Sequence, residues 1–149
     1  NALCSFFAAH GIQPYDEESG KGLVRHIFLR RGTHSGQIMV CLVCTRPKFP
    51  HSEEHVAALR EQFSDIASVL INVNAKKTNV ILGEKERVLF GPGFILDTLC
   101  GLTFRISSQS FYQVNATQTE VLYNEAIRLA KARISAAFSP PAISANFST

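Results

Sequence analysis

The apolar run Ile38-Met39-Val40-Cys41-Leu42-Val43-Cys44 restricts the possible folds of this chain more than any other segment. A strand that is apolar on both faces usually lies in the centre of a covered sheet. We therefore expect a buried central strand over Gln37 to Cys44. No apolar run in the chain approaches the roughly 20 residues that a membrane-spanning helix needs, so we expect no membrane association.

The cysteines of this run have the C-x-x-C spacing of many metal sites. Side chains three residues apart on a strand point to opposite faces, so Cys41 and Cys44 cannot bind one ion there. Cys4 and Cys100 have no second ligand nearby in the sequence. We interpret all four as buried small apolar thiols, which suggests a reducing, cytoplasmic environment.

His51 and His55 have the i, i+4 spacing of a helical metal pair. Ser52 is the expected cap of the next helix, and His51 therefore precedes the helix. A surface helix start explains the two histidines better than a metal site. We expect no metal ligand in this chain.

The other segments predict the remaining elements in a simple order. A helix over residues 1–10 and a strand from Leu23 to Arg31 precede the central strand, and a helix from Ser52 and a strand from Ala67 to Val73 follow it. Three short strands come next: Arg87 to Phe90, Phe94 to Leu99 and Leu102 to Ile106. We predict an α+β (α/β) fold in which a central mixed or antiparallel sheet has helices packed on one face.

The last part of the chain differs from the rest. Asn115 is a suitable helix cap, with Gln118 three residues further on, and apolar spacing predicts a helix over 116–134. Ser135 to Thr149 contains Ala, Ser, Pro and Phe without periodicity, which predicts a disordered tail. The expected organisation is a domain over 1–115, a helix over 116–134 and a tail over 135–149.

The net charge of +3 permits nucleic-acid binding but does not establish it. Five cations form a candidate phosphate-binding group if they lie at the same end of the sheet: Arg25, Arg30, Arg31, Lys76 and Lys77. A solvated strand face explains the three arginines equally well. The chain contains neither a phosphate-binding loop nor a G-x-G-x-x-G motif.

A polar and aromatic connection, Ser110-Phe111-Tyr112-Gln113-Val114-Asn115, follows the last predicted strand. The ring of Phe111 could stack on an unpaired base, and the amide of Gln113 could bind a base edge or a cofactor carboxylate. In the alternative, Phe111 and Val114 are core residues and Gln113 only caps the helix. The residues alone favour this alternative.

Three blocks of the sequence nevertheless resemble the RNA uracil-C5 methyltransferases, which make 5-methyluridine with S-adenosylmethionine. The resemblance covers about residues 10–130 and is closer to the ribosomal-RNA enzymes than to the transfer-RNA enzymes. Its blocks are Gly22 to Gly32, Asn72 to Gly83, and Phe104 to Ser107 together with Ser110 to Asn115.

The resemblance implies that the chain is the central domain of such an enzyme and the lead into its cofactor-binding domain. It places Phe111 near the target uracil and Gln113 near the cofactor, and Asn115 at the start of the helix. Family members commonly have Pro and Arg where this chain has Ser108 and Gln109. We therefore expect a less rigid turn and the loss of one phosphate contact.

The same resemblance implies that this segment is catalytically incomplete. The family's nucleophilic cysteine, its base and its glycine-rich cofactor loop belong to a C-terminal domain, and its iron–sulfur cysteines lie upstream. We therefore expect no catalytic residue here, no iron–sulfur cluster, and weak or no binding of S-adenosylmethionine. The expected partner is RNA, ribosomal rather than transfer RNA, in keeping with a role in rRNA processing. Two alternatives stay open, a stand-alone non-catalytic RNA-binding module and a structural fragment, and the oligomeric state is not predicted.

Overall fold

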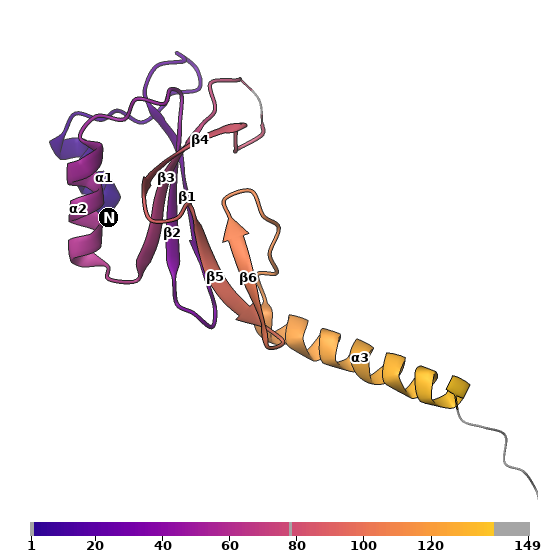
Figure 1. Ribbon diagram of the computed structural model, residues 1–149. Helices are drawn as coiled ribbons and strands as arrows, with labels where there is room; N and C mark the ends of the chain where they lie inside the picture. Colours follow the sequence, from indigo (N-terminus) through magenta and orange to yellow (C-terminus); the bar gives the residue numbers. More distant parts are fainter. Residues whose placement is uncertain (1, 78, 139–149) are drawn as a thin grey trace, which may run out of the picture. The chain divides into compact units, whose positions relative to one another are not determined.

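The computed structural model describes residues 2–77 and 79–138, and the chain divides into two compact units, Asn1–Tyr112 and Gln113–Thr149. Unit 1 is built on a four-stranded sheet in the order β1-β2-β3-β4 (Figure 1). The strands are β1 (Val24–Arg31), β2 (Ile38–Cys44), β3 (Ile66–Val73) and β4 (Lys85–Phe90). β2 and β3 pair in parallel and the other neighbours pair antiparallel, which confirms the mixed sheet and the central place of β2.

Two helices, α1 (Ala2–Ala9) and α2 (Ser52–Gln62), cover one face of this sheet (Figure 1). Alternate residues of β2, Val40, Leu42 and Cys44, point to this face and pack in one core with Phe7 and Leu59. Burial of each such large apolar side chain stabilises the fold by about 1.5–3 kcal/mol. The predicted arrangement, with helices on one face, is confirmed.

A hairpin of β5 (Phe94–Leu99) and β6 (Leu102–Ser107) covers the opposite face. Ile95 and Ile106 of this hairpin pack against Met39, Cys41 and Leu70 of the sheet. The two predicted strands therefore exist, but they form a separate two-stranded sheet. Both residues of the hairpin turn, Cys100 and Gly101, have positive φ angles (50° and 76°), as the twist of a tight hairpin requires.

The cysteines confirm one prediction and contradict another. Cys44 lies in the core beneath the helices and Cys41 in the core beneath the hairpin, so the C-x-x-C pair does point to opposite faces. Cys4, however, is exposed, and Cys100 is only partly buried. The expectation of four buried thiols is wrong for these two because Cys4 lies on the solvent side of α1 and Cys100 in a hairpin turn.

Of the two predicted helix N-caps, one is wrong and one is confirmed. The N-cap of α2 is His51 rather than Ser52, and it makes no side-chain cap hydrogen bond. In unit 2, the backbone N–H of Gln118 donates to Oδ1 of Asn115 at 3.1 Å, so Asn115 is confirmed as the cap of α3 (Ala116–Phe138).

α3 continues four residues beyond the predicted end at 134, and its added stretch includes two alanines, the residue type with the highest helix propensity. The rest of the predicted tail, 139–149, lies outside the described residues. Among the residues that are described, no helix combines the length and apolarity needed to cross a membrane.

Candidate functional site

The candidate site begins at the turn over Ser107 to Ser110, directly before Phe111. Within the turn, the backbone N–H of Ser107 donates to Oγ of Ser110 at 3.0 Å, and the two hydroxyls lie 2.9 Å apart. The N–H of Ser110 donates to the carbonyl of Ser107 at 3.3 Å. Serine hydroxyls can satisfy nearby backbone groups in this way, and the turn is closed by its own side chains.

The two residues that depart from the family pattern hold this turn to the sheet. The hydroxyl of Ser108 donates to the carboxylate of Glu86, and the Gln109 amide donates to the carbonyl of Gly83 at 3.1 Å. Ser108 is fully buried. Where family members commonly have a proline that stiffens the turn, this chain holds the turn in unit 1 through these two hydrogen bonds.

Arg30 holds the turn from the other side. Its guanidinium donates to the carbonyls of Ser108, at 2.9 Å, and Ser110, and it lies over the ring of Phe28. Burial lowers the pKa of Arg30, and its Nε has no hydrogen-bond partner among the described residues. Arg30 is therefore placed to order the turn before Phe111, while the neighbouring Arg31 is exposed.

A buried carboxylate, which sequence reasoning missed, supports the same corner. Asp97 is 1% exposed and accepts hydrogen bonds from the backbone N–H groups of Thr33, His34 and Ser35 at 2.9–3.0 Å. The hydroxyl of Tyr112 donates to it at 3.1 Å. Burial alone would raise the pKa of Asp97, but the backbone N–H donors outweigh burial and lower it.

Two asparagines, one near the end of β3 and one just after it, hold the loop that follows β3 and carries Lys76 and Lys77. Asn72 exchanges hydrogen bonds with the backbone of Gly83 and donates to Glu86 at 3.0 Å. Asn74 donates to the carbonyls of Val80 and Ile81, at 2.6 and 3.1 Å. Both side chains are buried, and buried amides need such partners to offset the loss of water.

Arg25 holds the same loop from β1. Its guanidinium donates to the carbonyls of Asn74 and Lys76 and to Glu17, and its side chain is only 3% exposed. Its two terminal nitrogens therefore donate within unit 1, whereas its Nε has no hydrogen-bond partner among the described residues. The prediction that Arg25 binds phosphate stays a prediction, and it would require these bonds to exchange.

The five cations of the predicted group do not lie at one end of the sheet. Arg25 lies beside the loop that carries Lys76 and Lys77, whereas Arg30 and Arg31 end β1. Five residues of extended strand separate Arg25 from Arg30 by about 16 Å. The phosphate-binding group as predicted is therefore split in two.

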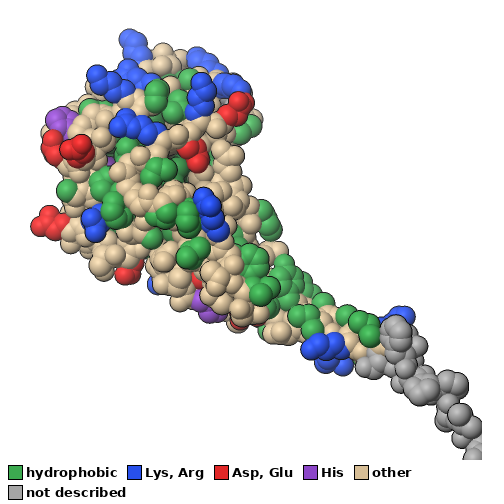
Figure 2. Space-filling model, viewed as in Figure 1, with side chains coloured by type: hydrophobic (Ala, Val, Ile, Leu, Met, Phe, Trp, Pro, Cys, Tyr) green, Lys and Arg blue, Asp and Glu red, His purple; other side chains and the backbone are tan. Residues whose placement is uncertain are grey.

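A larger basic surface forms at the end that holds Lys76 and Lys77. The register pairs Val24 with Cys44, Cys44 with Val73, and Val73 with Lys85, so the segments next to these residues meet there. Figure 2 shows Lys and Arg side chains gathered at this end. We call it the basic end, and its exposed cations are Lys21, Arg46, Lys76, Lys77 and Lys85. Sequence reasoning missed Arg46 and Lys85, which only the strand pairing brings close to the others.

One lysine of the basic end, Lys76, forms an ion pair. Lys76 lies 3.1 Å from Glu84, but both side chains are highly exposed, and such pairs contribute little to stability. The aliphatic end of Lys77 lies 3.7 Å from the position that a Cβ on Gly20 would occupy, so this lysine extends over the loop before β1. Both ammonium groups remain accessible to a polyanion.

The two residues that the resemblance singled out fall in different units. Phe111 is in unit 1, is 87% exposed and directly follows the fixed turn, so the prediction of a core residue is wrong for Phe111. Val114 is 99% exposed, so the core alternative is wrong for this residue too. Gln113 belongs to unit 2, one residue after the boundary. Its role with a cofactor stays a prediction.

The chain shows strong likeness to known proteins, although no family model matches it. An uncharacterized RNA methyltransferase of Listeria monocytogenes is 48% identical over 124 residues, and one of Oceanobacillus iheyensis is 46% identical over 121 residues. The chain is homologous to a segment of the RNA methyltransferases. The matches cover 83% and 81% of this chain but 27% and 26% of these two relatives.

A solved structure supports the same assignment. The crystal structure of Pyrococcus abyssi tRNA (uracil-54, C5)-methyltransferase in complex with S-adenosyl-L-homocysteine matches with a TM-score of 0.70 and 25% identity. The match covers 86% of this chain and 30% of that RNA methyltransferase. The resemblance to the RNA methyltransferases is thus confirmed, whereas its closer likeness to the ribosomal-RNA enzymes stays a prediction. The chain spans about a quarter of the length of its curated relatives.

Proposed function

We propose that this chain is the RNA-contacting central segment of a S-adenosylmethionine-dependent RNA uracil-C5 methyltransferase, with ribosomal RNA as the substrate class. The observation that carries the proposal is 48% identity to an RNA methyltransferase over 83% of the chain. The solved neighbour, a tRNA uracil-C5 methyltransferase bound to S-adenosyl-L-homocysteine, supports the reaction and the cofactor. The closer likeness of the sequence blocks to ribosomal-RNA enzymes supports the choice of RNA.

In this proposal the chain binds and orients RNA, and it does not carry the covalent chemistry. The family reaction needs a cysteine thiolate that attacks C6 of uracil and a base that removes the C5 proton. Burial raises the pKa of both Cys41 and Cys44 to about 12, so these thiols stay protonated at neutral pH. Because the resemblance also places the family's nucleophilic cysteine and base outside this segment, we expect the chain alone to transfer no methyl group, with Gln113 supplying only one cofactor contact.

The RNA contacts come from two features of unit 1. The basic end offers Lys76 and Lys77 to phosphates, which gives affinity without reading the bases. Phe111 offers an exposed ring directly after a turn that hydrogen bonds fix in place, and an aromatic ring of this kind can stack on an unpaired uracil.

Fluorescence anisotropy with a labelled rRNA hairpin that carries an unpaired uridine tests this division of roles. We expect the Lys76→Gln/Lys77→Gln double variant to lower the slope of log affinity against log salt by about 2, one for each phosphate contact. Lys131→Gln, which removes an exposed charge from α3, should leave that slope unchanged.

Phe111→Ala should weaken binding by about 1–3 kcal/mol at every salt concentration, because a stacking contact releases no counterions. Phe111→Trp keeps a ring and should bind like the wild type. An rRNA hairpin bound no better than tRNA would contradict the proposed substrate class. Absence of RNA binding at low salt would contradict the whole proposal.

A further inference from the structure

Three potential metal ligands that are far apart in the sequence meet between the two helices. His10 directly follows α1, His51 directly precedes α2, and Glu54 lies in the first turn of α2. One ligand atom from each of them lies within 4.8 Å of the others. Imidazole nitrogens and a carboxylate oxygen are a ligand set that Zn²⁺ commonly uses, with a fourth position left open.

The spacing of these atoms is close to that of a metal site. Nε2 of His10 lies 3.3 Å from one carboxylate oxygen of Glu54, and Nδ1 of His51 lies 3.0 Å from the other. Zn–N and Zn–O bonds of about 2.0–2.1 Å place tetrahedral ligand atoms about 3.3 Å apart. Each imidazole nitrogen therefore already lies at about this distance from one oxygen of Glu54, and a shift that brings three ligand atoms now within 4.8 Å of one another to about 3.3 Å would complete the site.

His10 is oriented in the way that a metal-binding histidine usually is. Its Nδ1 lies 3.0 Å from the carbonyl oxygen of Phe6, which accepts a hydrogen bond only if Nδ1 carries the proton. The lone pair is then on Nε2, which faces Glu54. The ring of Phe6 stacks on the imidazole at 4.0 Å and 21° and fixes its plane. A backbone carbonyl behind the ligating imidazole is the support that metal sites generally have.

His51 has a strained, left-handed backbone conformation. Its φ and ψ angles, 53° and 35°, are left-handed, and among the described non-glycine residues only Cys100 shares a positive φ. A left-handed residue costs about 1–2 kcal/mol, and this one gives α2 no side-chain cap in return. The conformation does bring the imidazole to Glu54. The hydrogen bond from His51 lowers the pKa of Glu54.

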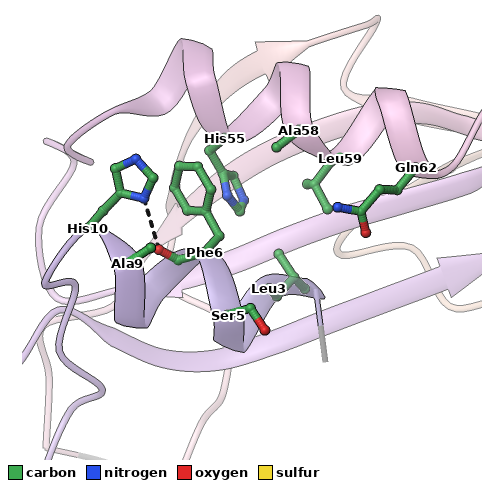
Figure 3. Close-up of a pocket in the computed structure, with 9 residues that line it drawn as sticks. All are labelled: Leu3, Ser5, Phe6, Ala9, His10, His55, Ala58, Leu59 and Gln62. Atoms are coloured by element: carbon green, nitrogen blue, oxygen red, sulfur yellow. Dashed lines mark hydrogen bonds between the residues drawn. The ribbon is translucent and has the colours of Figure 1, made fainter.

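A cavity of about 360 Å³ adjoins the cluster, with His10 and His55 among its lining residues (Figure 3). His55 is fully buried, and neither of its ring nitrogens has a hydrogen-bond partner among the described residues. The ring of Phe6, whose centroid is 4.8 Å from that of His55, belongs to the same group of aromatic side chains. The interpretation of His51 and His55 as a surface helix start is wrong for His55, which is buried, and the fold instead brings His51 to His10, with ring centroids 4.8 Å apart.

We propose that His10, His51 and Glu54 bind one divalent ion of the zinc class, which joins the end of α1 to the start of α2. The ion has three protein ligands and an open position for water or a small anion. In this arrangement the metal stabilises the attachment of α1, which among the described residues packs against α2 and contacts it through the His10–Glu54 pair. No step of the proposed RNA methylation depends on this site.

Isothermal titration of the purified full chain with Zn²⁺ tests the proposal. A Cys4→Ser background removes the exposed thiol, which could bind Zn²⁺ by itself. We expect one equivalent to bind and the unfolding temperature to rise with added Zn²⁺, because a ligand that binds only the folded state stabilises it. Co²⁺ in place of Zn²⁺ should give d–d absorption bands without a thiolate charge-transfer band.

His10→Gln, Glu54→Gln and His51→Asn should each weaken Zn²⁺ binding at least about tenfold. Asn tolerates the left-handed conformation, so His51→Asn should remain folded by circular dichroism. His34→Gln, on the exposed turn after β1, is the matched control and should bind Zn²⁺ like the parent chain. Binding that is absent in the parent, or unchanged in a folded His10→Gln/His51→Asn variant, would overturn the proposal.

Discussion

At the scale of single residues, Asp97 shows how one buried charge can organise a functional corner. Its carboxylate receives three backbone N–H groups from residues 33–35 and the hydroxyl of Tyr112. It therefore joins the β1–β2 turn to the hairpin and to the residue that follows Phe111. A carboxylate with several such donors is stable when buried because its negative charge is fully satisfied.

Asp97→Asn should destabilise the protein by about 2–3 kcal/mol, because the amide lacks the charge and presents a donor to the backbone donors. Urea unfolding at pH 7 measures the loss, and Asp65→Asn, at an exposed position, should stay within about 0.5 kcal/mol of the wild type.

The contribution of Asp97 to the free energy of unfolding should decrease at low pH. The folded-state pKa of Asp97 is lower than in the unfolded chain, so its stabilisation is present above about pH 4 and is lost as the pH falls through the folded pKa. The difference between wild type and Asp97→Asn should therefore shrink on acidification. A constant difference down to pH 2 would contradict this account.

The sequence could not have predicted this role. Asp97 occupies a buried position of β5 whose neighbours, Leu96 and Thr98, are exposed. Hydrophobic alternation would have placed the apolar Leu96 inside instead. The donors that reverse this preference lie 62 to 64 residues away in the chain and are backbone groups, which leave no signal in residue type.

At the scale of elements, the turn over Ser107 to Ser110 depends on neighbours more than on its own conformational preferences. The sequence comparison predicted a less rigid turn because Ser108 and Gln109 replace Pro and Arg. The structure instead holds the turn through Glu86, Gly83 and Arg30. Strand positions were predicted well because apolar runs and the turns that bound them are local signals, whereas these long-range polar contacts were not predicted.

Arg30→Lys should loosen this turn, since an ammonium group cannot reproduce the planar guanidinium that serves the carbonyls of both Ser108 and Ser110. We expect a loss of about 1–3 kcal/mol in stability and faster hydrogen exchange over residues 107–112. Arg31→Lys, the adjacent exposed arginine, is the control and should change neither quantity. Equal exchange rates in both variants would show that Arg30 does not hold the turn.

At the scale of the whole molecule, unit 1 contains both hydrophobic cores. The central strand β2 contributes to each of them, with Val40, Leu42 and Cys44 toward the helices and Met39 and Cys41 toward the hairpin. The fold class was predictable because this doubly apolar strand requires cover on both faces. The hairpin as the second cover was not predicted, since short strands can equally well extend an existing sheet.

A chain that ends at Tyr112 should therefore fold by itself and unfold cooperatively on heating, because every residue of both cores lies within 1–112. A chain that ends at Gly93 lacks the hairpin and exposes Met39, Cys41 and Leu70. We expect it to lose cooperative unfolding and to bind a hydrophobic dye. Calorimetry and dye fluorescence compare the two, and a disordered 1–112 chain would contradict the assignment of the cores.

The position of β1 at the edge of the four-stranded sheet has a consequence for solubility. An edge strand exposes unpaired backbone groups, to which a strand from another molecule can add. β1 has a register shift between Val24 and His26 at one end and the charged pair Arg30 and Arg31 at the other. Irregularity and charge on an edge both oppose intermolecular strand pairing, so we expect these arginines to limit aggregation, whatever they contribute to RNA binding.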